Sequence, residues 1–225
     1  MSILGKANLV NPILNNIDRT ETKRYAGMRG KIHFPEGIIA DACAIVMLEK
    51  HVKTVWTLYD YDCLKGCIGG EYTIDSELLS KHLQGSKQVV LISATIGDAV
   101  EHASSKYFEQ GDYALGLLID AAATAAVEQA ADALCVMLSS QFRKQGLNLT
   151  SRFSPGYGDW QLEEQDKVAK LAHVEAIGVL VTASKTLTPR KSITAIAGLR
   201  AGDKEEEKLA CSECLQKACI MRRGN

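Results

Sequence analysis

Residues 151–160 hold the side chains whose types and spacing best suit ligand binding. Arg152 is a permanent cation, and its planar fork of N–H donors suits a carboxylate. Pro155 and Gly156 occupy the second and third positions expected of a type II turn over residues 154–157. Next to them, Tyr157 offers a flat apolar face. These features predict a pocket for a small amphiphilic ligand with an amino-acid end, and the alternative is a tight turn that only leads into a helix.

A second group of reactive side chains closes the chain. Cys211, Cys214 and Cys219 have a spacing at which thiolates can converge on one metal ion or iron–sulfur cluster. Three thiolates make an incomplete tetrahedral set, so Cys63, Cys67 or a partner protein would have to supply a fourth ligand. The alternative is a tail of free thiols.

The central motif Arg-x-Ser-Pro-Gly-Tyr, beginning at Arg152, resembles the S-adenosylmethionine-binding motif of the activation (reactivation) domain of cobalamin-dependent methionine synthase. Residues 23–30, 93–97 and 188–195 and the Cys-rich tail agree with that family in order. The resemblance covers nearly the full length, and the chain looks like a stand-alone protein of this family.

The resemblance implies that this chain supports reductive remethylation of the cobalamin of a corrinoid methyltransferase, with methionine synthase as the expected partner. S-adenosylmethionine would be the methyl donor, the cobalamin would sit on the partner protein, and flavodoxin or another reductant would supply an electron. Arg152 would pair with the methionyl carboxylate, and Tyr157 would wall the pocket. The backbone of the turn at Ser154, Pro155 and Gly156 would meet the rest of the ligand.

This sequence departs from methionine synthase at several ligand positions. Methionine synthase has Ala where Ser154 stands and Pro where Gly158 stands, and its last strands carry a Tyr that is missing here. Its ligand-contacting Asp lies in an N-terminal segment for which this sequence shows no clear counterpart. Two other classes of function therefore stay open: a non-catalytic S-adenosylmethionine-binding adaptor, and an iron–sulfur electron-transfer protein for a corrinoid protein.

Composition narrows the range of partners and compartments. The 225 residues carry a formal net charge of −1, so no global basic field favours nucleic acid. No apolar run approaches the ~20 residues of a membrane span, and no export signal is evident. Seven cysteines, an odd number, indicate reduced thiols or metal ligands rather than a disulfide framework. We expect a cytoplasmic protein.

The elements that must position these residues follow from periodicity. Helices are predicted over residues 35–50, 112–144 and 160–173, and strands over 55–61, 71–74, 89–92, 177–182 and 193–199. The longest helix is predicted to be a core scaffold without chemistry, and residues 1–20 a loose arm. This pattern favours an α+β fold, and the resemblance implies a curved, largely antiparallel sheet with long packed helices. We predict an N-terminal arm and short helix at 1–30, an activation-domain-like domain at 31–200, and a charged linker with the Cys-rich tail at 201–225.

Overall fold

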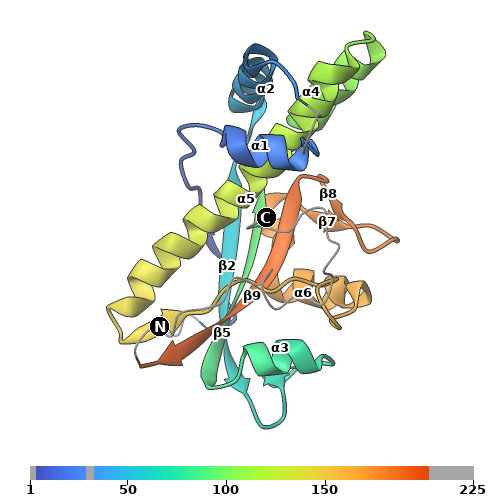
Figure 1. The fold of residues 1–225 in the computed structure, drawn as a ribbon. Helices are drawn as coiled ribbons and strands as arrows, with labels where there is room; N and C mark the ends of the chain where they lie inside the picture. Colours follow the sequence, from blue (N-terminus) through green and yellow to red (C-terminus); the bar gives the residue numbers. More distant parts are fainter. Residues whose placement is uncertain (1–3, 29–32, 203–225) are drawn as a thin grey trace.

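Three long antiparallel strands form the centre of the fold (Figure 1). The computed structural model describes residues 4–28 and 33–202. In the main sheet the order is β4-β3-β2-β5-β9-β6, and β1 pairs with the free part of β2. The strands are β1 (Asn8–Val10), β2 (Lys53–Asp62), β3 (Cys67–Ile68), β4 (Tyr72–Thr73), β5 (Ser86–Thr95), β6 (Leu147–Leu149) and β9 (Ser192–Ala201). Every strand pair is antiparallel, which confirms the predicted α+β class.

Both faces of the central strands are covered, because alternate side chains point to opposite sides of a sheet. Leu58, Val90 and Ile92 pack with Leu134 and Phe142 of the long helix on one face. The opposite face carries a second cluster, whose sheet members are Val55, Val89, Leu91 and Ile196. The predicted strand at 89–92 is confirmed, and its four apolar residues are buried on both faces of the sheet.

The long helix α5 (Tyr113–Arg143) crosses the whole sheet diagonally (Figure 1). Asp112 caps it, since its side chain accepts a hydrogen bond from the backbone N–H of Leu115 at 3.1 Å. By length and composition this helix could also cross a membrane, although no membrane span was predicted from the sequence. However, 56% of its most apolar window is buried inside the protein. The helix therefore packs as a core element of this fold.

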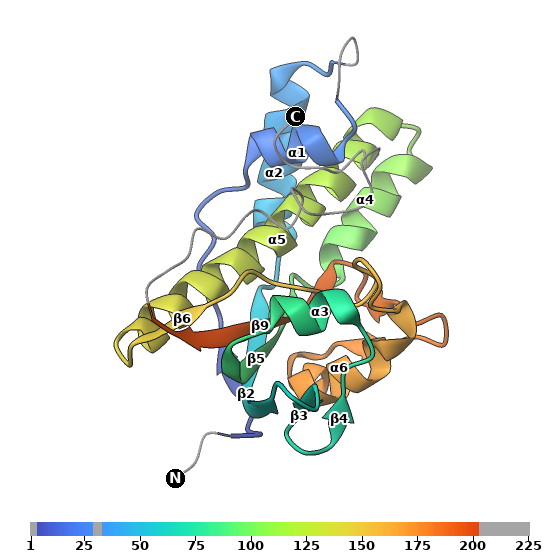
Figure 2. The ribbon, with the colours of Figure 1, turned by 60° about the horizontal axis from the view of Figure 1, so that its bottom comes forward.

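Three further helices surround the first half of α5 and form a helical lobe at one end of the sheet (Figure 2). They are α1 (Arg19–Tyr25), α2 (Glu36–Glu49) and α4 (Ala99–Glu109). The small side chains along α5, such as Ala122, Ala126 and Ala130, let these helices pack closely against it. Asp18 caps α1 by accepting from the backbone of Thr20 and Glu21. The lobe fixes the N-terminal arm against the middle of α5.

The other face of the sheet carries the short elements. These are α3 (Glu77–His82), η1 (Leu162–Glu164), α6 (Gln165–Ala172), η2 (Val174–Ile177) and the hairpin of β7 (Leu180–Val181) and β8 (Leu187–Thr188).

Three sequence expectations are wrong in detail. The arm before residue 20 contributes strand β1, the helix expected from residue 160 begins as 3-10 helix η1, and the strand expected over 177–182 shrinks to β7. The arm forms β1 because it pairs with β2, a partner distant in sequence.

Candidate functional site

The segment after β6 runs along the edge of the sheet beside β9. The backbone N–H of Thr150 donates to Gly198 at 2.9 Å, and Phe153 exchanges two backbone hydrogen bonds with Ile196 at 2.8 and 2.9 Å. Arg152 and Phe153 therefore occupy extended positions whose side chains point to opposite sides. The site residues are thus anchored to the central sheet rather than to a free loop.

The predicted turn is present. The carbonyl oxygen of Ser154 accepts from the N–H of Tyr157 at 3.1 Å, and Gly156 has φ of 88°, as the third position of a type II turn requires. The N–H of Gly156 donates to the carbonyl oxygen of Trp160 at 2.8 Å. Pro155 therefore sets a compact turn whose shape is stabilised from both sides.

Arg152 does not point into open solvent. Its guanidinium contacts Glu128 at 2.9 Å and Asp132 at 2.6 Å, both on α5. Burial alone would lower the pKa of Arg152, but attraction from Glu128 and Asp132 outweighs it and raises the pKa above its ordinary value. The carboxylate clamp predicted from the sequence is therefore a charged cluster of one arginine and two acids.

This cluster borders a groove between the N-terminal arm and α5. The groove has a volume of about 250 Å³, and its lining residues are Asp18, Glu21, Ala125, Glu128, Gln129 and Asp132. Arg24 contacts Glu21 at 2.7 Å, in the same way that Arg152 contacts the acids of α5. Carboxylates still outnumber guanidinium groups around the groove. Its chemistry suits a ligand that carries positive charge together with one carboxylate.

Gln129 joins the two walls of the groove. Its side-chain oxygen accepts from the backbone N–H of Asp18 at 2.9 Å, and its side-chain nitrogen donates to the carbonyl oxygen of Asn16 at 3.2 Å. The arm is thereby held on α5 by a residue more than a hundred positions away. These two bonds place Asp18 at the groove, although no N-terminal acid was predicted to contact the ligand.

The aromatic residues near the turn lie on the side opposite α5. The Tyr157 ring is 6.0 Å from the Phe153 ring, centre to centre, and Phe153 also contacts His82 of α3. Half of Tyr157 is exposed, whereas Trp160 is buried and donates from its ring nitrogen to the Tyr72 hydroxyl at 3.1 Å. The structure thus places Tyr157 next to Phe153, while Arg152 faces the groove on α5.

At Gly158 the backbone lies close to the side chain of Leu78 on α3. A Cβ at Gly158 would lie 2.6 Å from Cδ1 of Leu78, and its φ is 58°. The next residue, Asp159, is of a type that often caps the helix that follows it. Instead it caps α3, accepting from the N–H of Glu77 at 2.8 Å and from the Ser76 hydroxyl. The turn is therefore fastened to α3.

The acids of α5 were missed because the helix was treated as scaffold only. Glu128 and Asp132 are the only acidic residues between positions 121 and 158, and they stand four apart, on one face of a helix. Two acids at that spacing in an otherwise alanine-rich stretch were the available signal. The long helix therefore supplies part of the charged site.

The proposed metal site is not described. Cys211, Cys214 and Cys219 lie outside the described residues. Cys63 and Cys67, the suggested fourth ligands, flank the turn between β2 and β3. Within residues 4–28 and 33–202, no three His, Cys, Asp or Glu side chains are arranged to hold a metal ion.

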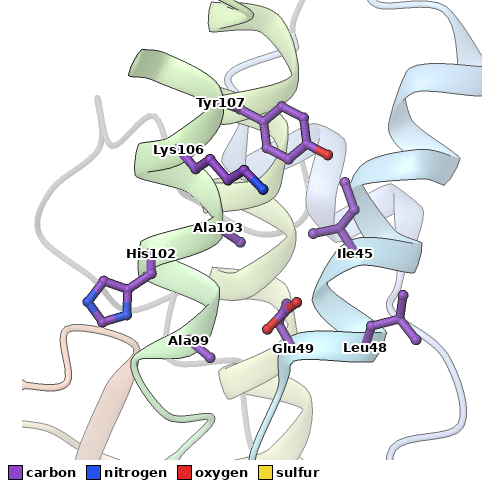
Figure 3. Close-up of a pocket in the computed structure, with 8 residues that line it drawn as sticks. All are labelled: Ile45, Leu48, Glu49, Ala99, His102, Ala103, Lys106 and Tyr107. Atoms are coloured by element: carbon purple, nitrogen blue, oxygen red, sulfur yellow. The ribbon is translucent and has the colours of Figure 1, made fainter. Parts of the chain in front are cut away.

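A second groove, of about 380 Å³, lies between α2 and α4 (Figure 3). Ile45 of α2 and Tyr107 of α4 face each other across it, and Glu49 points toward α4. None of the residues predicted to bind a ligand lines either groove, but two acids that line the first groove, Glu128 and Asp132, contact Arg152. The groove beside Arg152 is therefore the candidate site.

Comparison with known proteins bears on the fold. No family model and no curated protein matches this sequence. Among solved structures, the chain is similar to the crystal structure of the MetH reactivation domain bound to AdoHcy. The TM-score is 0.55 at 14% sequence identity, and the match covers 89% of this chain and 80% of that chain. The fold expected from the resemblance, an antiparallel sheet with long packed helices, is confirmed.

Proposed function

We propose that this chain binds S-adenosylmethionine in the groove beside Arg152. The observation that carries the proposal is the charged cluster of Arg152, Glu128 and Asp132 at the edge of an acidic groove, on a fold shared with a domain crystallised with AdoHcy. S-adenosylmethionine bears an ammonium, a sulfonium and a carboxylate. An acidic groove with the Arg152 guanidinium at its edge complements all three charges, once Arg152 releases part of its contact with Glu128 and Asp132.

In this proposal each residue has a distinct part. Arg152 exchanges some of its contact with Glu128 and Asp132 for the ligand carboxylate, while those acids face the cationic groups. Ser154, Pro155, Gly156 and Tyr157 do not line this groove, so their part is to form the turn that follows Arg152 and to hold that residue at the edge of the sheet. Bound S-adenosylmethionine supplies a methyl group. The protein contributes its position and orientation, and the exclusion of water around it.

We further propose that the chain acts in trans, as a reactivation protein for the cobalamin of a corrinoid methyltransferase such as methionine synthase. The partner carries the cobalamin, and flavodoxin or a reductant of the same class supplies the electron. The fold likeness to a reactivation domain supports this assignment. A non-catalytic adaptor would bind S-adenosylmethionine equally well but would not restore activity to an oxidised corrinoid protein.

Calorimetric titration with S-adenosylmethionine tests the site. We expect Arg152→Ala to weaken binding by about 1.5–3 kcal/mol, the contribution of a charge-assisted pair. Arg190→Ala is the matched control, because Arg190 also pairs with an acid, Glu101, at 3.0 Å but lies outside the groove. Equal affinity of wild type and Arg152→Ala would contradict the proposed site.

A reactivation assay tests the proposed role as a reactivation protein for a corrinoid methyltransferase. Purified chain, S-adenosylmethionine and a reductant are added to an oxidised corrinoid methyltransferase, and recovered methyl transfer is measured. We expect recovery with wild type and little with Arg152→Ala. Binding without recovery would support the adaptor.

A further inference from the structure

The groove between α2 and α4 exists because small side chains line one of its walls. Both helices pack on the first half of α5, with Ala42 and Val46 of α2 and Val100 of α4 in one core cluster. On α4, Ala99 and Ala103 line the groove and stand four residues apart, so they share one face of the helix. Their single methyl groups leave a volume of about 380 Å³, which lies in the range of small-molecule sites.

The inner part of this groove is apolar. Ile45 of α2 and Ala103 and Tyr107 of α4 line it and pack against the same core cluster. Leu48 lines it near the end of α2, and 82% of this side chain is exposed to water. A ligand with an apolar body is therefore stabilised here, because it removes this surface and its own from water.

Two opposite charges border this apolar surface, one from each helix (Figure 3). The Lys106 ammonium and the Tyr107 hydroxyl point toward α2, the Glu49 carboxylate points toward α4, and the ring of His102 points away from the groove. Among the residues that the structure describes, neither Lys106 nor Glu49 has an ion-pair partner, whereas Glu101 on another side of α4 contacts Arg190 at 3.0 Å. The two charges are thus too far apart to pair directly across the groove.

We propose that this groove binds a free apolar α-amino acid. Such a molecule carries an ammonium and a carboxylate on one carbon atom, together with an apolar side chain. Its carboxylate pairs with Lys106 and accepts from the Tyr107 hydroxyl, its ammonium pairs with Glu49, and its side chain lies on Ile45 and Ala103. A simple anion or cation satisfies only one of the two charges, and an uncharged apolar ligand satisfies neither. This site is separate from the groove beside Arg152.

Titration of the isotopically labelled full-length chain with L-leucine, followed by NMR, tests the proposal. We expect shifts of the backbone signals of residues 45–49 and 99–107, with a dissociation constant in the millimolar range because both charges are exposed. L-Leucinamide lacks the carboxylate, and N-acetyl-L-leucine lacks the ammonium. Each should bind about three- to tenfold more weakly than leucine, the loss of one charge-assisted contact at an exposed site.

Matched variants assign each ligand group to its partner. Lys106→Met should bind leucine and leucinamide nearly equally, and Glu49→Gln should no longer distinguish leucine from N-acetyl-leucine. Lys170→Met and Glu109→Gln are the controls, because Lys170 is an exposed lysine in the last turn of α6 and Glu109 is the exposed last residue of α4, both outside the groove. Arg152→Ala should also keep the wild-type affinity for leucine, which separates this test from that of the S-adenosylmethionine site.

Three results would overturn the proposal. The first is an absence of shifts in α2 and α4 up to the solubility limit of leucine, which would leave Lys106 and Glu49 as two solvated surface charges. The second is wild-type affinity for leucine in both Lys106→Met and Glu49→Gln. The third is equal binding of leucine, leucinamide and N-acetyl-leucine by the wild type, which would reduce the groove to an apolar surface without charge recognition.

Discussion

Neutralising Glu128 should reduce the preference of the site for S-adenosylmethionine over S-adenosylhomocysteine. The two ligands share the ammonium and the carboxylate and differ in the sulfonium charge. We therefore use the dissociation constant of S-adenosylhomocysteine divided by that of S-adenosylmethionine. This ratio isolates the attraction between the sulfonium charge and the groove. Changes in how Arg152 holds the shared carboxylate affect both ligands and cancel in the ratio.

The size of the effect follows from the exposure of the two acids. A unit charge about 6 to 8 Å from a carboxylate, at an effective dielectric constant of 20 to 40, gains about 1–3 kcal/mol. The Glu128 side chain is 23% exposed and Asp132 is 50% exposed, so solvent screens Asp132 more strongly. We expect Glu128→Gln to lower the ratio by about five- to tenfold, near the lower end of that range, and Asp132→Asn to lower it by less.

Calorimetry with both ligands, for wild type and each variant, gives the ratios. Glu101→Gln is the matched control, because Glu101 is 16% exposed and also pairs with an arginine, but lies on α4 outside the groove. The reasoning would be refuted by groove variants that keep the wild-type ratio, or by a Glu101→Gln variant that shifts it equally.

Three further outcomes are expected. Gly158→Ala should destabilise the protein by about 1–3 kcal/mol in urea denaturation, because its φ is positive and its new methyl meets Leu78. The double variant Gly158→Ala with Leu78→Ala should recover part of the stability that Gly158→Ala loses through this contact, measured relative to Leu78→Ala alone. Asp159→Asn should flatten the acid side of the stability profile. Burial raises the pKa of Asp159, but hydrogen bonds from Ser76 and the α3 backbone outweigh it, so the folded pKa lies below the unfolded value. Wild type therefore holds this stabilisation above the unfolded pKa and loses it as pH falls through the folded pKa, whereas Asn does not titrate. Finally, burial raises the pKa of the Cys135 thiol to about 11, so iodoacetamide at pH 8 should alkylate exposed Cys63 well before Cys135.

Local signals in the sequence predicted the long elements well. The apolar run at 89–92 and the spacing along 112–144 each act through neighbours within a few positions. The turn over residues 154–157 belongs with them, since Pro and Gly set its dihedral angles directly.

Partnerships between distant segments were not predictable in this way. Asp159 has the composition of a local helix cap, yet its partners Glu77 and Leu78 lie about eighty positions earlier. Arg152 has the chemistry of a carboxylate clamp, but the rotation of α5 decides which acids reach it. These contacts depend on how finished elements dock, which one sequence does not encode locally.

The two hydrogen bonds of Gln129 have a consequence for the order of synthesis. They close the groove between an arm at the beginning of the chain and the middle of α5, a separation of 111 and 113 residues. The arm leaves the ribosome long before Gln129 is made, so it cannot dock until the middle of α5 has been synthesised. Contacts of such high sequence separation carry a larger loop-closure entropy cost, which slows their formation. We therefore expect this groove to be completed in a slow step, when the arm docks on α5.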